Sequence, residues 1–303
     1  MQLPLVQIDA FADARPSPGW PERAAPALSV VPFTGNPAAV MPLPHWLPDA
    51  LLQQIAEENN LSETAFVVAA LPDGVSAPEP SAPAYHLRWF TPAIEVTLCG
   101  HATLATAAHL FTSAHPSADR LWFHSLSGWL TVRRDPFDHG LLELDFPADD
   151  LRPVDADPAV LAALGLSEDD VEAVFQSLDL IVVVRSASLV ADLAPDHTAL
   201  ARFDQRGVIV TAAGDDPATD GPDVVSRWFG AGAGVGEDPV TGSAHSQIAP
   251  YWAQRLGRDE LRARQLSRRG GELRCRVVGD RVLIAGRWRG YLLGTVELPD
   301  SRQ

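Results

Sequence analysis

The alternation of apolar and polar positions predicts many short strands joined by turns, with three helices among them. Residues 5–11 are expected to form the first strand, and residues 47–60 have the spacing of a helix that buries one face. Residues 102–111 are small and apolar on all sides, which predicts a helix that runs through a core. A second small-residue helix is expected over residues 244–256. Further strand-like stretches cover residues 64–68, 121–124, 128–133, 141–146, 180–184 and 208–211.

A repeated triplet indicates that this pattern occurs twice. Arg-Trp-Phe at residues 88–90 recurs at residues 227–229, and Cys99 and Asp238 each follow the Phe of their triplet by nine residues. A Gly-containing turn, a small-residue helix and a Gly-led strand come next in both halves. The matching order favours a duplicated unit of strands around a central helix.

The composition excludes several kinds of chemistry. The 303 residues contain no lysine, and the 23 arginines face 39 Asp and Glu, for a formal net charge of −16. Without lysine there is no Schiff-base nucleophile, which excludes pyridoxal-phosphate and aldolase-type imine chemistry, and no Gly-Lys-Ser/Thr phosphate loop. The acidic balance argues against nucleic-acid and membrane-surface partners, because both require basic patches.

Cysteine usage and hydropathy predict a cytoplasmic protein. Two cysteines, Cys99 and Cys275, make no disulfide framework, so a reducing compartment is expected. The start of the chain lacks the basic and apolar regions of a signal peptide, and no apolar run reaches the ~20 residues of a membrane helix. Residues 13–32 and 72–83 are rich in proline and are expected to be loops.

The two repeated turns are suited to bind an anion. Each turn opens a helix, whose first N–H groups lack intrahelical acceptors and lie at the positive end of the helix dipole. Two such helix starts facing each other would cradle a carboxylate or phosphate, and Gly100 and Gly242 would allow close backbone approach. Ser243 would add a hydroxyl, whereas Thr241 has the alternative role of a simple N-cap.

The candidates for proton transfer are Glu63, Cys99, His101 and Asp238. Glu63 precedes an apolar strand, where partial burial would tune it as a general base; the alternative is a surface turn capped by Ser62. A thiol at a helix start is expected to have a lowered pKa, but Cys99 is equally compatible with a small buried apolar role. His101 is either an acid of the site or a satisfied polar residue.

Other common site patterns are absent from the sequence. No group of His, Cys and acidic residues has the spacing of a metal site, so no metal is expected. There is no Gly-x-Ser-x-Gly nucleophile turn. Residues 230–236 are rich in glycine but lead into Glu237 rather than a dinucleotide-binding helix, so no nucleotide cofactor is expected.

Five stretches, in order, carry a family resemblance. They are Phe-Thr-Gly-Asn-Pro-Ala-Ala-Val at residues 33–40, Asn-Leu-Ser-Glu-Thr-Ala-Phe at 60–66, Arg-Trp-Phe-Thr-Pro at 88–92 with Glu95 and Val96, Cys-Gly-His-Ala-Thr-Leu-Ala at 99–105, and Glu-Asp-Pro-Val-Thr-Gly-Ser-Ala at 237–244. The sequence resembles the phenazine-biosynthesis-protein-like (PhzF-like) isomerases, relatives of diaminopimelate epimerase and proline racemase. The stretches span nearly the whole chain and are specific as a set.

The resemblance implies an α+β fold of two pseudo-symmetric diaminopimelate-epimerase-like domains. Each is a mostly antiparallel β-barrel around a central helix, with the site in the cleft between them. The expected N-terminal domain is residues 1–117 with 289–303, and the C-terminal domain is residues 118–288. The resemblance also implies a homodimer that transfers a proton on a small carboxylate-bearing substrate without any cofactor.

Residue roles follow from the same resemblance. Glu63 matches the glutamate that moves a proton between carbons, and His101 and Asp238 match the groups that polarise or protonate the substrate. The residues expected to bind the substrate are Gly100, Gly242, Ser243, Cys99 and Asn36.

Two departures from the family pattern leave three hypotheses. Residues 13–31 replace a short link, as a surface insertion or a flap. Cys99 holds the place of the first catalytic cysteine of the racemase relatives, but the second is absent near residues 238–242, which argues against a Cys/Cys racemase. The hypotheses are an isomerase using Glu63, a racemase or epimerase pairing Cys99 with an acidic partner, and a non-catalytic protein that binds small acids.

Overall fold

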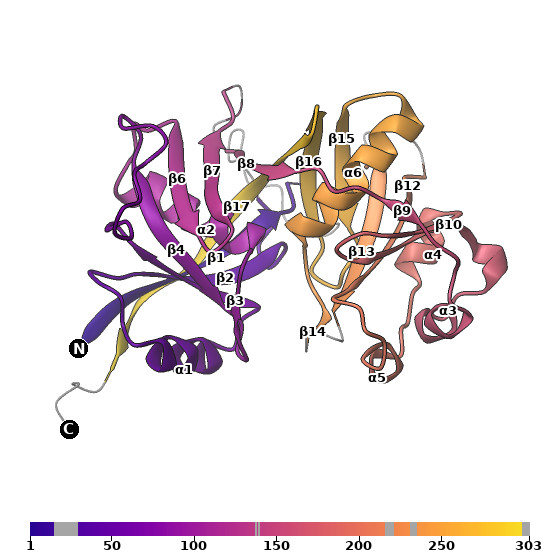
Figure 1. Ribbon diagram of the computed structural model, residues 1–303, viewed down its shortest axis with the longest axis horizontal. Helices are drawn as coiled ribbons and strands as arrows, with labels where there is room; N and C mark the ends of the chain where they lie inside the picture. Colours follow the sequence, from indigo (N-terminus) through magenta and orange to yellow (C-terminus); the bar gives the residue numbers. More distant parts are fainter. Residues whose placement is uncertain (15–29, 137, 139, 216–220, 231–234, 299–303) are drawn as a thin grey trace. The chain divides into compact units, whose positions relative to one another are not determined.

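The chain folds into two compact units, each with its own strands and its own central helix (Figure 1). The computed structural model describes residues 1–14, 30–136, 138, 140–215, 221–230 and 235–298. The first unit comprises Met1–Asp145 and Ala285–Gln303, and the second comprises Phe146–Ile284. The first boundary therefore falls at residues 145/146, not at the expected 117/118, because the strands after residue 117 pair within the first unit.

In the first unit, strands close into a ring around one helix. The strands are β1 (Gln2–Ala12), β2 (Asn36–Pro42), β3 (Glu63–Val68), β4 (Ala84–Phe90), β5 (Glu95–Val96), β6 (Arg120–Ser125), β7 (Gly128–Arg134), β8 (Leu142–Pro147) and β17 (Arg281–Glu297), and the helices are α1 (Asp49–Asn59) and α2 (Gly100–Ser113). The pairs β1–β2, β3–β4, β6–β7 and β7–β8 are antiparallel, whereas β2–β3 and β4–β6 are parallel. β17 pairs with both β8 and β1 and closes the barrel.

Helix α2 is buried on nearly every side, as its small apolar sequence predicts (Figure 1). It packs against β1, β2, β3 and β7. Its two buried hydroxyls are satisfied within the helix: those of Thr103 and Thr106 donate to the carbonyl oxygens of Cys99 and Ala102, four residues earlier. Because no hydroxyl is left unbonded, the helix can occupy the barrel interior without a desolvation penalty.

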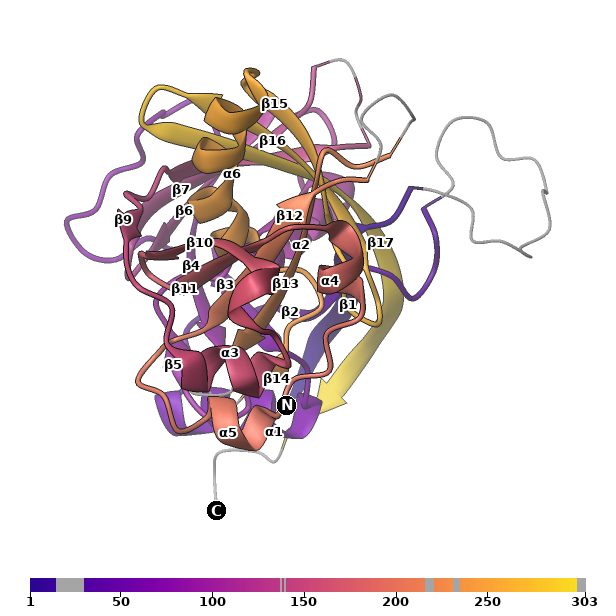
Figure 2. The same cartoon turned by 90° about the vertical axis from the view of Figure 1, so that its right-hand side faces the viewer.

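The second unit repeats this arrangement around α6 (Gly242–Leu256). Its strands are β9 (Arg152–Pro153), β10 (Val171–Gln176), β11 (Leu180–Val184), β12 (Val208–Ala213), β13 (Val224–Gly230), β14 (Val235–Glu237), β15 (Glu260–Gln265) and β16 (Gly271–Val278), and its short helices are α3 (Pro158–Leu164), the 3-10 turn Glu168–Asp170, α4 (Ala187–Ala191) and α5 (His197–Leu200). Figure 2 shows α3, α4 and α5 on the viewer's side of this unit. An apolar cluster that includes Leu161, Val182 and Val210 fills the space under them.

Pairing order confirms the duplication. Neighbouring strands in the first unit follow the order β1–β2–β3–β4–β6, and those in the second follow β10–β11–β12–β13–β15. In both orders the successive pairs are antiparallel, parallel, antiparallel and parallel. The repeated triplet begins with Arg88 and Arg227, which form the same bidentate ion pair with Glu95 and Glu237. The α+β fold of two mostly antiparallel barrels, each around a central helix, is therefore confirmed.

The structure corrects the register of the repeat. Cys99 is the N-cap of α2, and Thr241, not Asp238, is the N-cap of α6. Counting back four residues from each cap reaches Glu95 and Glu237, so Asp238 corresponds to Val96. Between the Arg-Trp-Phe triplet and its paired glutamate, the second copy has three more residues than the first, and they fall in the glycine-rich segment. Because of this insertion, the equal spacing of nine residues from Phe to Cys99 and from Phe to Asp238 does not mark equivalent positions.

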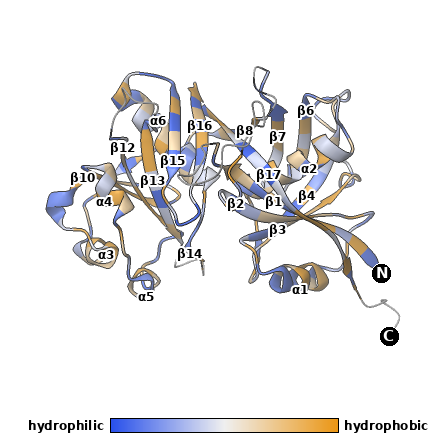
Figure 3. Ribbon diagram, turned by 180° about the vertical axis from the view of Figure 1, so that it is seen from behind, coloured by the Kyte–Doolittle hydropathy of each residue, from blue (hydrophilic) through white to orange (hydrophobic). Residues whose placement is uncertain are grey.

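The hydropathy of the elements agrees with their positions. Helix α1 carries both orange and blue residues in Figure 3, and it buries Leu52, Ile55 and Ala56. Within the described ranges, none of the helices combines the length and the apolar character needed to cross a membrane. Cys99 and Cys275 are both buried and free. The cytoplasmic location stays a prediction.

Candidate functional site

The register of β2, β3 and α2 gathers four predicted residues in the first unit. β2 begins at Asn36 and β3 at Glu63, and the two strands run parallel. Helix α2 packs on both strands and presents His101 in its first turn, directly after Cys99. Glu63 begins a strand with 17% of its side chain exposed, so the alternative of a surface turn is wrong.

His101 is the centre of this group. Its Nε2 lies 3.1 Å from Oε2 of Glu63, and its Nδ1 lies 3.2 Å from the side-chain amide of Asn36 and 3.5 Å from Sγ of Cys99. The His101 side chain is 5% exposed and Asn36 is fully buried. The ring is therefore contacted on both edges. Glu63 lies at the Nε2 edge and is more exposed than Asn36 and Cys99, which lie at the Nδ1 edge.

The charge state of His101 follows from these neighbours. Burial of the ring acts to lower the pKa of His101, but Cys99 and Glu63 outweigh burial and raise that pKa well above its ordinary value. The Glu63 carboxylate, 3.1 Å from Nε2, therefore favours the cationic form of the ring.

Cys99 does not have the lowered pKa expected at a helix start. Burial, with a further contribution from the charge of Glu63, raises the pKa of the Cys99 thiol to about 11, although His101 acts in the opposite direction. Because the side chain is almost fully buried, desolvation outweighs the helix dipole. At neutral pH this thiol is protonated and is a poor nucleophile.

Gly100 is buried at the start of α2 between Cys99 and His101, and the other predicted residues lie at the start of α6 in the second unit. Asp238 accepts a hydrogen bond from the Thr241 hydroxyl at 2.5 Å, so this hydroxyl binds Asp238 instead of capping the helix. Gln265, which the sequence analysis missed, joins the two: it accepts from the Thr241 backbone N–H at 2.9 Å and donates to the Asp238 carbonyl oxygen at 2.7 Å. Gly242 is buried and Ser243 is partly exposed.

Ser243 has a cationic neighbour that the sequence analysis also missed. Arg206 donates to the Ser243 hydroxyl oxygen at 3.2 Å and forms a bidentate pair with the buried Asp179 at 2.8 and 2.5 Å. Asp179 also accepts from Trp228 and Gln247, so the guanidinium is fixed in orientation. Arg206 lies two residues before β12, and nothing in that sequence context distinguishes it from the other arginines.

The second unit has no counterpart of Glu63. Thr64 pairs with Phe90, and Val208 pairs with Phe229, the matching residue of the repeat, so Gly207 occupies the position of Glu63. A Cβ atom at Gly207 would lie 2.4 Å from the ring of Trp228. The packing of this tryptophan therefore excludes a glutamate from the second copy without rearrangement.

The same cluster in the first unit has donors for a metal ion. Glu63, Cys99 and His101 offer one ligand atom each, and these atoms lie within 4.8 Å of one another. Sequence spacing gave no sign of this group, because Glu63 precedes the other two residues by more than 30 positions. Only the pairing of β2 with β3 under α2 brings them together.

Comparisons with known proteins agree with the fold and the motifs. The sequence model of the PhzC-PhzF family, phenazine biosynthesis-like protein, matches residues 26–288. A protein of Pseudomonas aeruginosa named as an uncharacterized isomerase is 46% identical, over 98% of this chain and 100% of its own length. The crystal structure of a PhzF-family protein of Enterococcus faecalis has a TM-score of 0.81 at 40% identity and covers 98% of this chain and 100% of that chain.

A more distant structure shows how widely the fold is shared. A hydroxyproline epimerase of Agrobacterium vitis with bound trans-4-hydroxy-L-proline has a TM-score of 0.55 over 99% of this chain and 94% of that chain, at 11% identity. This similarity shows the fold alone. The family match covers most of the sequence, and the chain therefore belongs to the phenazine biosynthesis-like (PhzC-PhzF) proteins.

Proposed function

We propose that the chain is an isomerase that moves a proton between carbons of a small carboxylate-bearing substrate, with no metal or organic cofactor. The observation that carries this proposal is the 3.1 Å pair of Glu63 and His101 at the start of a buried helix. The carboxylate is partly exposed, whereas its cationic partner is buried. The name isomerase given to a relative that is 46% identical supports the same reaction class.

In this mechanism Glu63 accepts a proton from one substrate carbon and returns it to another. The electron pair of the broken C–H bond moves into the unsaturated system of the substrate and forms the new C–H bond at the second carbon. The carbon that loses the proton is formally oxidised and the carbon that gains it is formally reduced by the same amount, so the substrate as a whole is unchanged in oxidation level and the reaction needs no redox partner. The cationic His101 stabilises the carboxylate form of Glu63 before the first transfer and after the second, and Asn36 holds the ring in place.

The second unit has groups of its own that suit an anion such as a carboxylate. The Ser243 oxygen accepts from Arg206, which leaves the hydroxyl proton available to donate to an anion. The first N–H groups of α6, from Gly242 onward, have no intrahelical acceptor. Asp238, fixed by Thr241, is the proposed acid among the residues of the second unit.

The racemase alternative is less compatible with these residues. A two-base racemase requires a reactive group in each half, but the Cys99 thiol has a pKa of about 11 and Thr241 holds the matching cap position. Gly207 leaves no carboxylate at the position of Glu63. One carboxylate that acts twice fits these residues better than a pair of bases.

The proposal is tested by proton exchange with solvent. The chain is incubated in D2O with a panel of cyclic and amino carboxylates that includes trans-4-hydroxy-L-proline. Deuterium at a carbon position of a panel member, measured by NMR and mass spectrometry, is the expected result. Binding of a carboxylate without exchange across the panel would instead favour a small-acid binding protein.

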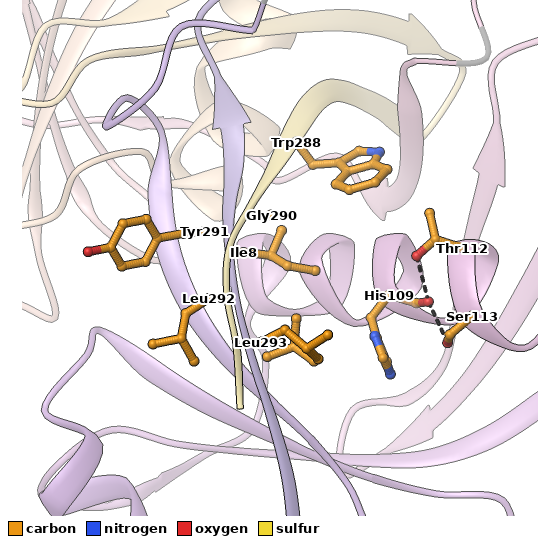
Figure 4. A pocket seen from close by; sticks show the side chains of 10 residues that line it. Ile8, His109, Thr112, Ser113, Trp288, Gly290, Tyr291, Leu292 and Leu293 are labelled. Atoms are coloured by element: carbon orange, nitrogen blue, oxygen red, sulfur yellow. Dashed lines mark hydrogen bonds between the residues drawn. The ribbon is translucent and has the colours of Figure 1, made fainter. Parts of the chain in front are cut away.

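We also propose that the chain forms a homodimer through an apolar patch of the first unit, defined by Tyr291, Leu292 and Leu293, which are 58, 42 and 81% exposed. Beside these residues lies a cavity of about 450 Å³ whose lining includes Trp288 and no Asp, Glu or Arg (Figure 4). Burial lowers the pKa of His109 on its wall, which keeps that ring neutral. Two copies of a chain with net charge −16 repel each other, so an uncharged apolar surface suits self-association.

Leu293→Glu is expected to convert the dimer into a monomer, because it adds one carboxylate per copy to the apolar patch. Light scattering after size-exclusion chromatography would show the mass fall from twice 32.5 kDa to 32.5 kDa. The matched control is Leu126→Glu, which replaces a leucine that is 65% exposed outside the patch and should leave the dimer intact. A dimer that survives Leu293→Glu, or a monomeric wild type, would contradict this interface.

A further inference from the structure

We propose that Glu63, Cys99 and His101 bind one soft divalent cation such as Zn²⁺, and that the bound cation blocks the proton transfer. The three ligand atoms, a carboxylate oxygen, a sulfur and a ring nitrogen, lie within 4.8 Å of one another. Oxygen, sulfur and imidazole nitrogen are the donors of zinc sites, whereas Mg²⁺ and Ca²⁺ sites use oxygen. Three protein ligands leave a fourth coordination position open for water or a substrate carboxylate.

The neighbours of the cluster resemble the surroundings of a metal site. Metal-binding histidines usually form a hydrogen bond through their second ring nitrogen, which fixes the ring. Here the side-chain amide of Asn36 lies 3.2 Å from Nδ1 of His101, where its oxygen would accept from Nδ1–H once the amide is turned over, while Nε2 faces Glu63. The ligands Cys99 and His101 are buried, so little side-chain freedom is lost when they close on an ion.

A cation that binds to this cluster must take the place of the protons on Cys99 and on the coordinating nitrogen of His101. The cation displaces the thiol proton of Cys99, forming a metal–sulfur bond, and displaces the proton on the coordinating nitrogen of His101. Both protons go to solvent, and the two positive charges of the ion replace them beside the Glu63 carboxylate. Nothing is oxidised or reduced.

Metal binding and proton transfer would exclude each other, and this consequence rests on the proposed function. A carboxylate that is coordinated to a cation cannot accept a proton from carbon, and a coordinated His101 no longer carries the charge that pairs with Glu63. The site would therefore be active in its protonated form and silent when occupied by Zn²⁺.

Binding is tested with Co²⁺ as a spectroscopic substitute for Zn²⁺. Titration of the full chain without oxygen is expected to produce a near-ultraviolet band from thiolate-to-cobalt charge transfer, which saturates at one ion per chain. The band should vanish in Cys99→Ser and persist in Cys275→Ser, which alters the other free, buried cysteine. Absence of the band in the wild type, or its persistence in Cys99→Ser, would overturn the site.

A second variant keeps the test valid if Cys99→Ser unfolds. Glu63→Gln changes a partly exposed side chain and is expected to weaken Co²⁺ binding by at least ~10-fold while preserving the thermal unfolding transition. Unchanged affinity in a folded Glu63→Gln protein would remove Glu63 from the ligand set.

The exchange reaction separates this inference from the function on which it rests. Where deuterium exchange is observed, one equivalent of Zn²⁺ should abolish it and a chelator should restore it. Exchange that continues in the Zn²⁺-loaded chain would overturn the exclusion. Cobalt binding in a chain that exchanges no deuterium would support the metal site and contradict the isomerase.

Discussion

Glu63→Gln is expected to lower the rate of deuterium exchange by ~10²–10⁴-fold, the usual contribution of a positioned general base. The amide has nearly the shape of the carboxylate, but it cannot accept a proton from carbon at neutral pH. The chain should still fold, because the side chain is at the beginning of β3 and is partly exposed. The exchange rate on whichever panel carboxylate the wild type labels is the measurement.

A second readout distinguishes a catalytic role from a structural one. Because the charge of Glu63 contributes to raising the pKa of His101, Glu63→Gln should lower that pKa, as followed by NMR titration of the ring protons. The matched control is Glu260→Gln, which alters the first residue of another strand, with 59% of its side chain exposed. Full exchange activity in Glu63→Gln would show that another group is the base.

Local patterns were sufficient to predict most elements of the fold. The expected strand over residues 5–11 is β1, and the small apolar stretch at residues 102–111 lies within the buried α2. What the sequence did not show is closure. β17 pairs with β1 across almost the whole length of the chain, and such long-range pairing leaves no local periodicity to detect.

The sequence was sufficient to name the candidate site residues but not to predict which of them lie together. Cys99 and His101 are neighbours in the sequence, whereas Glu63 and Asn36 reach them only through the pairing of β2 with β3. The raised pKa of Cys99 depends on complete burial, which the position at a helix start concealed. The partners Arg206 and Gln265 were missed because their role comes from tertiary contacts alone.

The duplicated fold carries unequal chemistry in its two copies. The first copy has a carboxylate, an imidazole and a thiol at its helix start, and the second has Gly207, Ser243 and Thr241 at the matching positions. Trp228 fills the space that a second glutamate would need. The carboxylate is therefore present at this position in one copy only, an asymmetry that suits the proposed single-base isomerase.

The second helix also contains a buried histidine, His245, that should make the fold sensitive to acid. His245 donates through Nδ1 to the Thr241 carbonyl oxygen at 2.8 Å, and its Nε2 lies 3.3 Å from the Ser226 hydroxyl, so the neutral ring is fully bonded. Burial lowers the pKa of His245 to about 4, although the bond to Thr241 acts to raise it. Protonation would place an unpaired charge among the apolar residues around α6.

The sign of the effect follows from the two pKa values. As pH falls through about 6.5, the unfolded chain gains a proton at His245, whereas the folded chain gains it only near pH 4. The unfolded state is therefore favoured progressively across this window, and the free energy of unfolding should fall by about 3 kcal/mol between pH 6.5 and pH 4. Urea unfolding of the wild type and of His245→Gln, measured at several pH values, isolates this contribution as the difference between their slopes.

His245→Gln is expected to lose much of this pH dependence even if the substitution lowers stability at neutral pH. The matched control is Thr103→Val at the corresponding position of α2, which removes a buried side-chain bond to a carbonyl oxygen but no titrating group. It should shift the unfolding curves by a constant amount and leave the slope with pH as in the wild type. If the free energy of unfolding of His245→Gln falls with pH as steeply as that of the wild type, other groups make the fold sensitive to acid. The buried neutral imidazole of His245 would then not determine the lowest pH at which the second barrel stays folded.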